Sequence, residues 1–209
     1  KKNKVNHKNI NYIFCDYKKL NILKKKLNKP FEYVVNLGGY IDHSKFFSGG
    51  KSVIENHFLS TMNLLTSLKK KKLKRYLHIG TCDEYGSNVS PIKENCKEDP
   101  ITSYAVSKLA SINLLTMLYK TENFPATILR LFLVYGPYQK NDRLIPQVIN
   151  GCLNKKKFPV SKGNQLRDFC YVDDVINAII FSLVKKVALG KIFNVGSGRP
   201  VSVKFLINK

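Results

Sequence analysis

A tyrosine and a lysine four residues apart, Tyr104 and Lys108, could carry out acid–base chemistry. Residues at this spacing lie on one face of a helix, so the phenol and the ammonium can approach each other. A free tyrosine has a pKa of about 10, and a nearby cation lowers this pKa by favouring the phenolate. The pair could then exchange a proton with an alcohol or a carbonyl while a cofactor moves hydride. Such pairs also arise by chance on helices, so the spacing alone does not decide the function.

A threonine at the end of the preceding predicted strand could complete this site. Thr81 lies in the segment 80–86, GTCDEYG. Its hydroxyl could hydrogen-bond the substrate oxygen that Tyr104 protonates. The alternative interpretation is that Thr81 only caps a turn.

Apolar patterns predict strands and helices in alternation along the chain. Buried strands are predicted at residues 9–15, 31–37, 75–79, 126–134 and 191–195. Helices are predicted at residues 18–27, 53–69, 103–120, 145–153 and 172–184. This order is typical of a mostly parallel α/β sheet that is covered on both faces. Ligands bind such sheets beyond the carboxyl ends of the strands. The residues found there are Asp16, Gly38, Gly39, Thr81 and the run 135–137.

Five short motifs follow one another in an order that resembles a known family. They are Thr81 with Tyr85-Gly86, Tyr104 with Lys108, Arg130 with Tyr135-Gly136-Pro137, Arg167-Asp168-Phe169 with Val172-Asp173-Asp174, and Phe193-Asn194-Val195-Gly196. From about residue 10 to about residue 203, the chain resembles the NAD-dependent epimerase/dehydratase family of extended short-chain dehydrogenases. The resemblance implies an N-terminally truncated, Rossmann-type doubly wound parallel α/β sheet with a small C-terminal substrate lobe. It further implies a partial NAD(P)-binding domain over residues 1–135 and a partial substrate-binding lobe, interwoven with the sheet, over 136–209.

The resemblance also implies roles for individual residues. Those that match the family's catalytic triad are Thr81, Tyr104 and Lys108. Those that match contacts to the cofactor, NAD or NADP, are Asp16, Gly38, Gly39, Asn56, Tyr104 and Lys108. Those that match contacts to a nucleoside-diphosphate sugar are Thr81, Arg143 and Arg167, with Arg167 on the pyrophosphate. The structural alternatives for Asp16, Asn56 and Arg167 are a strand cap, a polar group on a helix surface and a surface ion pair.

Three departures from the family's pattern affect the expected function. No G-x-x-G-x-x-G loop, which would bind the cofactor pyrophosphate at a helix N-terminus, precedes the first predicted strand, so we expect a truncated chain. The family's 4,6-dehydratases carry Asp-Glu after the catalytic threonine, whereas this chain carries Cys82 and Asp83, which disfavours dehydration. Leu133 stands where the family commonly has an asparagine, which alters the expected sugar pocket.

These observations predict a nucleotide-sugar oxidoreductase that acts at carbon 4 of a nucleoside-diphosphate hexose, as a 4-epimerase or a 4-ketoreductase. The run 80–86, together with Leu133 and residues 143–146, resembles the CDP-abequose/paratose synthase type of reductase. The alternatives are a non-catalytic truncated remnant and a 4,6-dehydratase. The resemblance also suggests a homodimer, with the predicted helices at 53–69 and 103–120 as candidates for its interface.

Composition narrows the classes of partner. The formal charge is +22, but only five of the 36 basic residues are arginines, and no nucleic-acid-binding motif accompanies the charge, so we expect no nucleic-acid partner. Five widely spaced cysteines without a C-x-x-C pair predict reduced thiols and no metal site. No apolar run is long enough to span a bilayer, and no signal-like stretch follows the basic N-terminus. We therefore expect a cytoplasmic protein that does not bind membranes.

Overall fold

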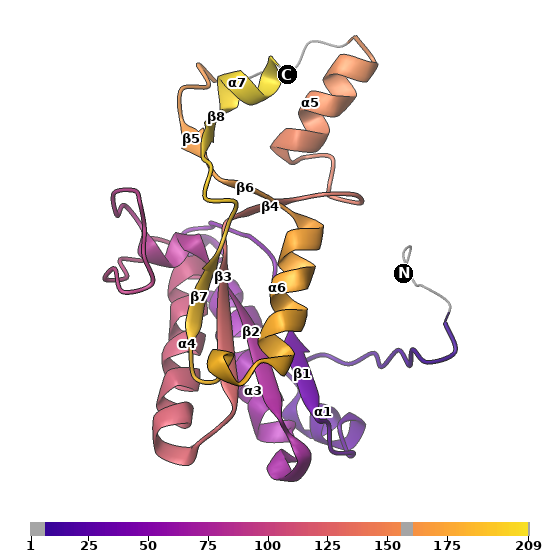
Figure 1. The fold of residues 1–209 in the computed structure, drawn as a ribbon. Helices are drawn as coiled ribbons and strands as arrows, with labels where there is room; N and C mark the ends of the chain where they lie inside the picture. The colour runs from indigo at the N-terminus through magenta and orange to yellow at the C-terminus, as the bar shows by residue number, and fades with distance from the viewer. Residues whose placement is uncertain (1–6, 156–160, 209) are drawn as a thin grey trace.

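A four-stranded parallel sheet forms the centre of the computed structural model, which describes residues 7–155 and 161–208. The strands stand in the order β1-β2-β3-β7 (Figure 1). They are β1 (Tyr33–Asn36), β2 (Arg75–Thr81), β3 (Ala126–Leu131) and β7 (Ile192–Val195). Every neighbouring pair is parallel, so the predicted parallel α/β arrangement is confirmed.

Helices lie on both faces of this sheet (Figure 1). The first face carries α1 (Leu20–Lys26), α3 (Ser60–Ser67) and α4 (Ser103–Glu122), and the second carries α6 (Val172–Val184), which contacts β2 and β3. The helix predicted at 53–69 begins earlier than expected, as α2 (Gly50–Ile54), and contains a π-helical turn, η2 (Glu55–Leu59), before α3. Such turns often occur at functional sites.

Side-chain alternation along the strands separates two halves of the core. Tyr76 and Ile128 point towards α1, α3 and α4, in an apolar cluster completed by Leu23, Leu64, Leu65, Ile112, Leu115, Phe124 and Ala126. Arg75 and Leu129 point to the other side. The Arg75 guanidinium donates to the carbonyl oxygen of Lys185, just after α6, at 3.0 Å. The sheet is therefore packed against helices on both faces.

Residues 9–15, predicted to be a buried strand, do not form one. The segment is irregular, and Ile10 and Ile13 are 45% and 44% exposed. A strand needs a neighbour to pair its backbone groups. Within the described residues, β1 pairs only with β2 and forms the edge of the sheet, so this segment has no strand beside it.

A smaller layer lies beyond the carboxyl ends of the sheet strands (Figure 1). The predicted strand at 126–134 is divided, because the chain leaves β3 and continues as β4 (Leu133–Tyr135), which pairs with β6 (Phe169–Tyr171). The strand β6, the antiparallel pair β5 (Leu166–Arg167) and β8 (Val201–Ser202), and α7 (Val203–Ile207) were not predicted from the sequence. The helix α5 (Leu144–Leu153) agrees with its prediction to within one residue.

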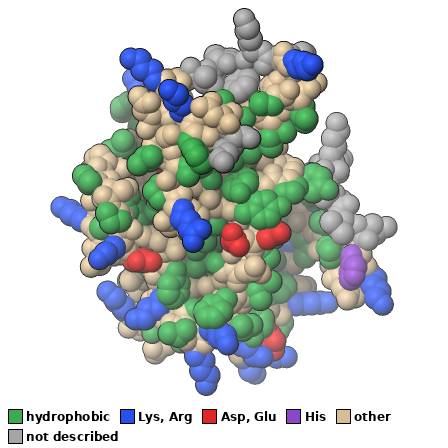
Figure 2. Space-filling view, turned by 45° about the horizontal axis from the view of Figure 1, so that its top comes forward, with side chains coloured by type: hydrophobic (Ala, Val, Ile, Leu, Met, Phe, Trp, Pro, Cys, Tyr) green, Lys and Arg blue, Asp and Glu red, His purple; other side chains and the backbone are tan. Residues whose placement is uncertain are grey.

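The surface shows no single dominant feature on the face drawn in Figure 2. Lysine and arginine side chains are scattered there among apolar and uncharged groups rather than gathered in one patch. No helix within residues 7–155 and 161–208 combines the length and hydropathy needed to cross a bilayer. The same residues contain no cluster of His, Cys, Asp and Glu that could hold a metal ion, and all five cysteines are free.

Candidate active site

Thr81 is held in place by a reciprocal pair of hydrogen bonds at the end of β2. It begins the 3₁₀ turn η4 (Cys82–Tyr85), and its hydroxyl oxygen accepts a hydrogen bond from the Asp83 N–H at 3.2 Å. The Glu84 carboxylate in turn accepts from the Thr81 N–H at 2.9 Å. This is a capping box, which fixes the direction of the threonine side chain. Thr81 shares the wall of one cavity with Tyr104 and lowers the pKa of its phenol in part.

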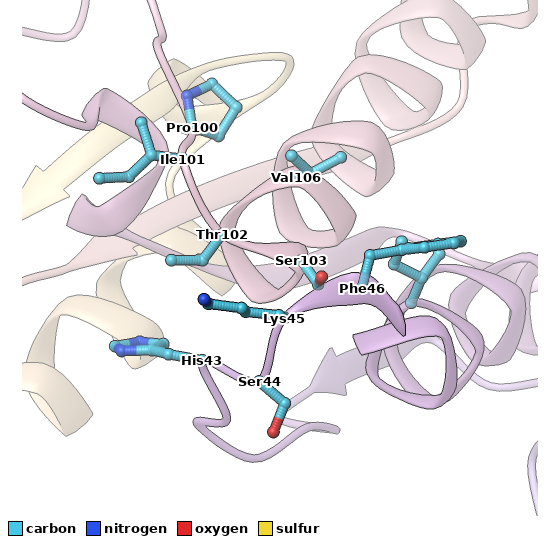
Figure 3. Close-up of a pocket in the computed structure, with 10 residues that line it drawn as sticks. His43, Ser44, Lys45, Phe46, Pro100, Ile101, Thr102, Ser103 and Val106 are labelled. Carbon is cyan, nitrogen blue, oxygen red and sulfur yellow. The ribbon is translucent and has the colours of Figure 1, made fainter. Parts of the chain in front are cut away.

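Tyr104 and Lys108 lie in the first two turns of α4, and Thr102 sets where that helix begins. The Thr102 hydroxyl accepts a hydrogen bond from the Ala105 N–H at 3.1 Å and so caps the helix. Figure 3 shows Thr102 among the residues that line a pocket where this helix begins. Both side chains are buried, with Tyr104 7% and Lys108 4% exposed. The structure therefore brings Thr81 and Tyr104 together and places Lys108 one helical turn further along.

The pKa of Tyr104 does not follow the sequence prediction. Burial raises this pKa to about 12, the hydrogen bond from Thr81 lowers it in part, and the charge of Asp83 adds to the rise. Burial also lowers the pKa of Lys108 to about 8, against the opposing effect of the Glu84 charge. The predicted lowering of the tyrosine pKa is thus wrong for this structure, because loss of solvation disfavours the phenolate more than its surroundings stabilise it.

A cavity of about 450 Å³ adjoins Thr81 and Tyr104 at the carboxyl end of the sheet. Arg143, which precedes α5, and Arg167, in β5, also line it. Both arginines are exposed, and within the described residues Arg167 forms no ion pair. The described residues therefore do not contain the surface ion pair that was the alternative interpretation of Arg167. Four predicted site residues from distant parts of the chain share this cavity.

A second cavity, of about 370 Å³, is lined by Asp16, Gly38, Gly39 and Asn56, together with Tyr40 and His57. The Asn56 amide donates to the Tyr40 hydroxyl at 3.0 Å. A carboxylate, a glycine turn and an amide around a cavity suit the hydroxyls and flat ring of a nucleoside. These residues therefore fit the nucleoside part of a dinucleotide, although the sequence holds no G-x-x-G-x-x-G loop for its pyrophosphate. Lys108 does not line this cavity.

Gly39 allows the turn of this second cavity to form, so Gly39→Ala is expected to lower the free energy of unfolding by about 1–3 kcal/mol. Its φ is +135°, and a Cβ there would lie 2.5 Å from Cε1 of the buried His57 ring. Urea unfolding measures the loss. Gly198→Ala is the control, since Gly198 also has a positive φ, +69°, but a Cβ added there would have no heavy atom within 4 Å. Equal losses in the two variants would contradict the predicted clash with His57.

The match that decides the family covers residues 1–196, which fit the model of the NAD dependent epimerase/dehydratase family. The chain belongs to the NAD-dependent epimerase/dehydratase family. It is 29% identical over 220 residues to the dTDP-D-glucose 4,6-dehydratase of Dictyostelium discoideum, an alignment that covers 93% of this chain and 50% of that protein. The chain spans about half the length of the curated relatives it matches.

Solved structures of the family superpose on this fold. RMD from Pseudomonas aeruginosa, complexed with NADPH, is 27% identical with a TM-score of 0.84, covering 94% of this chain and 70% of that chain. UDP-glucuronic acid 4-epimerase from Bacillus cereus, in complex with NAD, is 30% identical with a TM-score of 0.80, covering 89% of this chain and 60% of that chain. These likenesses confirm the predicted Rossmann-type fold.

His57, in the turn η2, lines the second cavity but was not predicted from the sequence as a site residue. It is 3% exposed, and its ring lies edge-on to that of Tyr104, with 5.2 Å between centroids. Its Nε2 donates to the Tyr40 carbonyl oxygen at 2.9 Å, because a carbonyl can only accept. Burial, then the charge of Lys108, lower the pKa of His57 to about 4, so the ring is neutral at pH 7. Nothing in the sequence around a single helical histidine indicates that its ring will pack against a tyrosine of the site.

The second missed feature is an ion pair without exposed surface, between Arg130 in β3 and Glu84 in η4. Arg130 Nε donates to Glu84 Oε2 at 2.5 Å. The other guanidinium nitrogens donate to the Tyr85 hydroxyl at 2.9 Å and to Glu98 Oε1 at 2.6 Å. Two signals in the sequence could have revealed it: an arginine inside an otherwise apolar strand, and the T-x-x-E spacing of a capping box.

Proposed function

We propose that this protein is an NAD(P)-dependent nucleotide-sugar oxidoreductase that acts at carbon 4 of a nucleoside-diphosphate hexose, as a 4-epimerase or a 4-ketoreductase. The observation that carries the proposal is that Thr81 and Tyr104 line the same cavity as Arg143 and Arg167. Membership of the family, whose relatives include a UDP-glucuronic acid 4-epimerase solved with NAD, supports it.

Tyr104 is the residue that donates and accepts the proton. With a pKa of about 12 it is a phenol at neutral pH, and it can give its proton to an oxygen that becomes negative as a sugar carbonyl is reduced. The Thr81 oxygen already accepts from the Asp83 N–H, so its own hydrogen can be directed towards Tyr104 or a substrate oxygen. Lys108 supplies positive charge that favours the phenolate left after proton transfer. The nicotinamide cofactor, when bound, supplies or accepts hydride.

Arg143 and Arg167 are proposed to hold the pyrophosphate of the nucleotide sugar. A planar guanidinium binds phosphate oxygens in pairs, which orients the ligand as well as attracting it. Both arginines come from the C-terminal layer, and Thr81 and Tyr104 come from the sheet side of the same cavity. A ligand that spans the cavity would therefore present its sugar to Tyr104. In the second cavity, Asp16, Gly38, Gly39 and Asn56 are proposed to bind the nucleoside end of the cofactor.

Dehydration is disfavoured by the two residues after Thr81, although several relatives bear the name of a 4,6-dehydratase. Burial, followed by the charge of Asp83, raises the pKa of the Cys82 thiol to about 12, so this thiol is a much weaker acid than the carboxylic acid that the family's 4,6-dehydratases carry at this position. Asp83 contacts His43 at 3.3 Å. Elimination of water needs an acid–base pair at this point, and Cys82 is a poor replacement for its acid.

A reductant requirement distinguishes the two proposed reactions. The protein is incubated with nucleoside-diphosphate hexoses and with their 4-keto-6-deoxy derivatives, and products are separated by chromatography and mass spectrometry. A 4-epimerase is expected to interconvert two hexoses without net change in reduced nicotinamide, whereas a 4-ketoreductase consumes one equivalent of NAD(P)H per product. Loss of water from the hexose would instead identify a dehydratase. If no nucleotide sugar reacts or binds, the proposed function is refuted in favour of a non-catalytic protein.

A further inference from the structure

Glu84 connects the backbone of Thr81 to a buried cation in the neighbouring strand. Its Oε1 accepts from the Thr81 N–H at 2.9 Å, and its Oε2 accepts from Arg130 Nε at 2.5 Å. Gly80 makes room for the carboxylate, because a Cβ at that position would lie 2.9 Å from Glu84 Oε1. Glu84 is fully buried, so neither oxygen can replace its partner by water without a change in structure.

The charge of Glu84 also acts on Lys108, because η4 packs against α4 and both side chains are buried. Burial lowers the pKa of Lys108, and the Glu84 charge is the influence that opposes it. The effect is mutual, since Lys108 and, more strongly, Arg130 oppose the rise in the Glu84 pKa, to about 6, that burial causes. Glu84 is therefore mostly ionised at neutral pH and offsets two cations in a region with little solvent.

Glu98 provides a natural comparison, because it binds the same guanidinium from the other side. Its carboxylate accepts from Arg130 Nη2 at 2.6 Å, and its side chain is 31% exposed. It lies in the segment 87–102, which is also fastened to β7 by a hydrogen bond from the Asn194 N–H to Glu94 at 2.8 Å. Among the described residues, no hydrogen bond joins Glu98 to Thr81, and its charge is not one of those that shift the pKa of Lys108.

We propose that Glu84 is a positioning residue of the active site: anchored by Arg130, it holds Thr81 at the cavity wall and supplies the negative charge that balances the Lys108 ammonium. The inference rests on the proposed function of Thr81, Tyr104 and Lys108. Glu84 acts through these residues, because its two oxygens are occupied by the Thr81 N–H and by Arg130.

The groups that could titrate around Glu84 and Lys108 come from six elements. They are Arg130 from β3, Lys108 and Tyr104 from α4, Cys82, Asp83 and Tyr85 from η4, Glu98 from the segment 87–102, His78 from β2 and His57 from η2. Burial lowers the pKa of both histidines, to about 4 for His57 and well below the ordinary value for His78, so both rings are neutral above pH 6. Burial raises the pKa of Tyr104 and of Cys82 to about 12, so a change near pH 8 reports on Lys108.

Glu84→Gln and Glu98→Gln form the matched pair for the test, measured as kcat and KM against pH in the native protein. The glutamine oxygen can still accept from the Thr81 N–H, but its amide nitrogen cannot accept from Arg130 Nε, so Glu84→Gln removes the charge and the Arg130 hydrogen bond while keeping the Thr81 contact. For Glu84→Gln we expect kcat at neutral pH to fall about tenfold, with KM within about threefold, and the alkaline limb of the kcat profile to move to lower pH by about one unit. For Glu98→Gln we expect less than about a threefold change and an unmoved profile.

Equal losses in the two variants, with identical pH profiles, would overturn the proposal and leave Glu84 as a partner of Arg130 only. If Glu84→Gln does not fold, Glu84→Gln with Arg130→Met removes both charges together, a change that buried pairs often tolerate. This double variant is expected to show the same shift of the alkaline limb. An unmoved limb would again overturn the proposal.

A second measurement does not depend on turnover. In a double-mutant cycle with Lys108→Met, followed by urea unfolding, the effects of Glu84→Gln and Lys108→Met are expected to be non-additive near neutral pH. The non-additivity should vanish at about pH 10, where Lys108 is neutral in the folded protein. Additive effects at neutral pH would refute the coupling. If the effects of the two variants are coupled but no nucleotide sugar reacts, the proposed function is wrong, whereas the interaction of Glu84 with Lys108 is supported.

Discussion

Replacing Tyr104 by phenylalanine is expected to reduce turnover of the nucleotide sugar by about a thousandfold or more, while the affinity for NAD(P) changes by less than about threefold. The change removes only the hydroxyl, which is the group proposed to exchange the proton with the sugar oxygen. The ring stays buried and keeps its edge-on contact with His57, so the fold around the second cavity should not change. Single-turnover kinetics and a cofactor-binding titration measure the two quantities separately.

Tyr76→Phe is the control for this prediction. Tyr76 is also a buried tyrosine, with 0% exposure, and its hydroxyl accepts a hydrogen bond from the Asn36 amide at 3.0 Å, on the α3 side of the sheet. Its loss should affect stability rather than turnover. If Tyr104→Phe kept more than about a tenth of the activity, the assignment of the proton donor would be wrong, since general acid catalysis contributes about a hundredfold at least.

Arg130→Met is expected to lower the free energy of unfolding by about 3–5 kcal/mol at pH 7.5, because it leaves the Glu84 carboxylate buried without a counter-charge. Both side chains of the pair have no exposed surface. The substitution also removes donors from the Tyr85 hydroxyl and from Glu98. Chemical denaturation with urea measures the loss, and Arg143→Met, which changes an exposed arginine, is expected to have an effect of less than about 0.5 kcal/mol.

The loss in Arg130→Met should depend on pH in a defined direction. Burial already raises the folded-state pKa of Glu84 to about 6, above the ordinary value of 4.5, and Arg130 is the strongest influence opposing that rise. Ionisation of Glu84 therefore costs stability as pH rises through the folded pKa, and removal of Arg130 moves this pKa higher. The variant should be closest to the wild type below pH 4.5, where Glu84 is protonated in both states. An equal loss at pH 4.5 and pH 7.5 would contradict this account.

The amino-acid sequence by itself determined the order of helices and strands, because apolar periodicity is a local property. The prediction for residues 172–184 coincides with α6, and that for 103–120 with most of α4. It also predicted that Thr81 and the residues around Gly38 lie at one edge of the sheet, since the carboxyl ends of parallel strands meet there. The proximity of Thr81 and Tyr104 follows from the same topology.

Only the tertiary structure decided which strands find neighbours and how the buried charges behave. Residues 9–15 have a strand-like composition, but no described strand lies beside them to pair with their backbone. The pKa of Tyr104 rises rather than falls, because desolvation depends on everything packed around the phenol. Glu84 and Arg130 are 46 residues apart in the chain, and only the folded sheet brings them together. Burial and long-range charge pairing are properties of the packed molecule: a local pattern can mark a buried arginine or a capping box, but it does not say which of these groups meet.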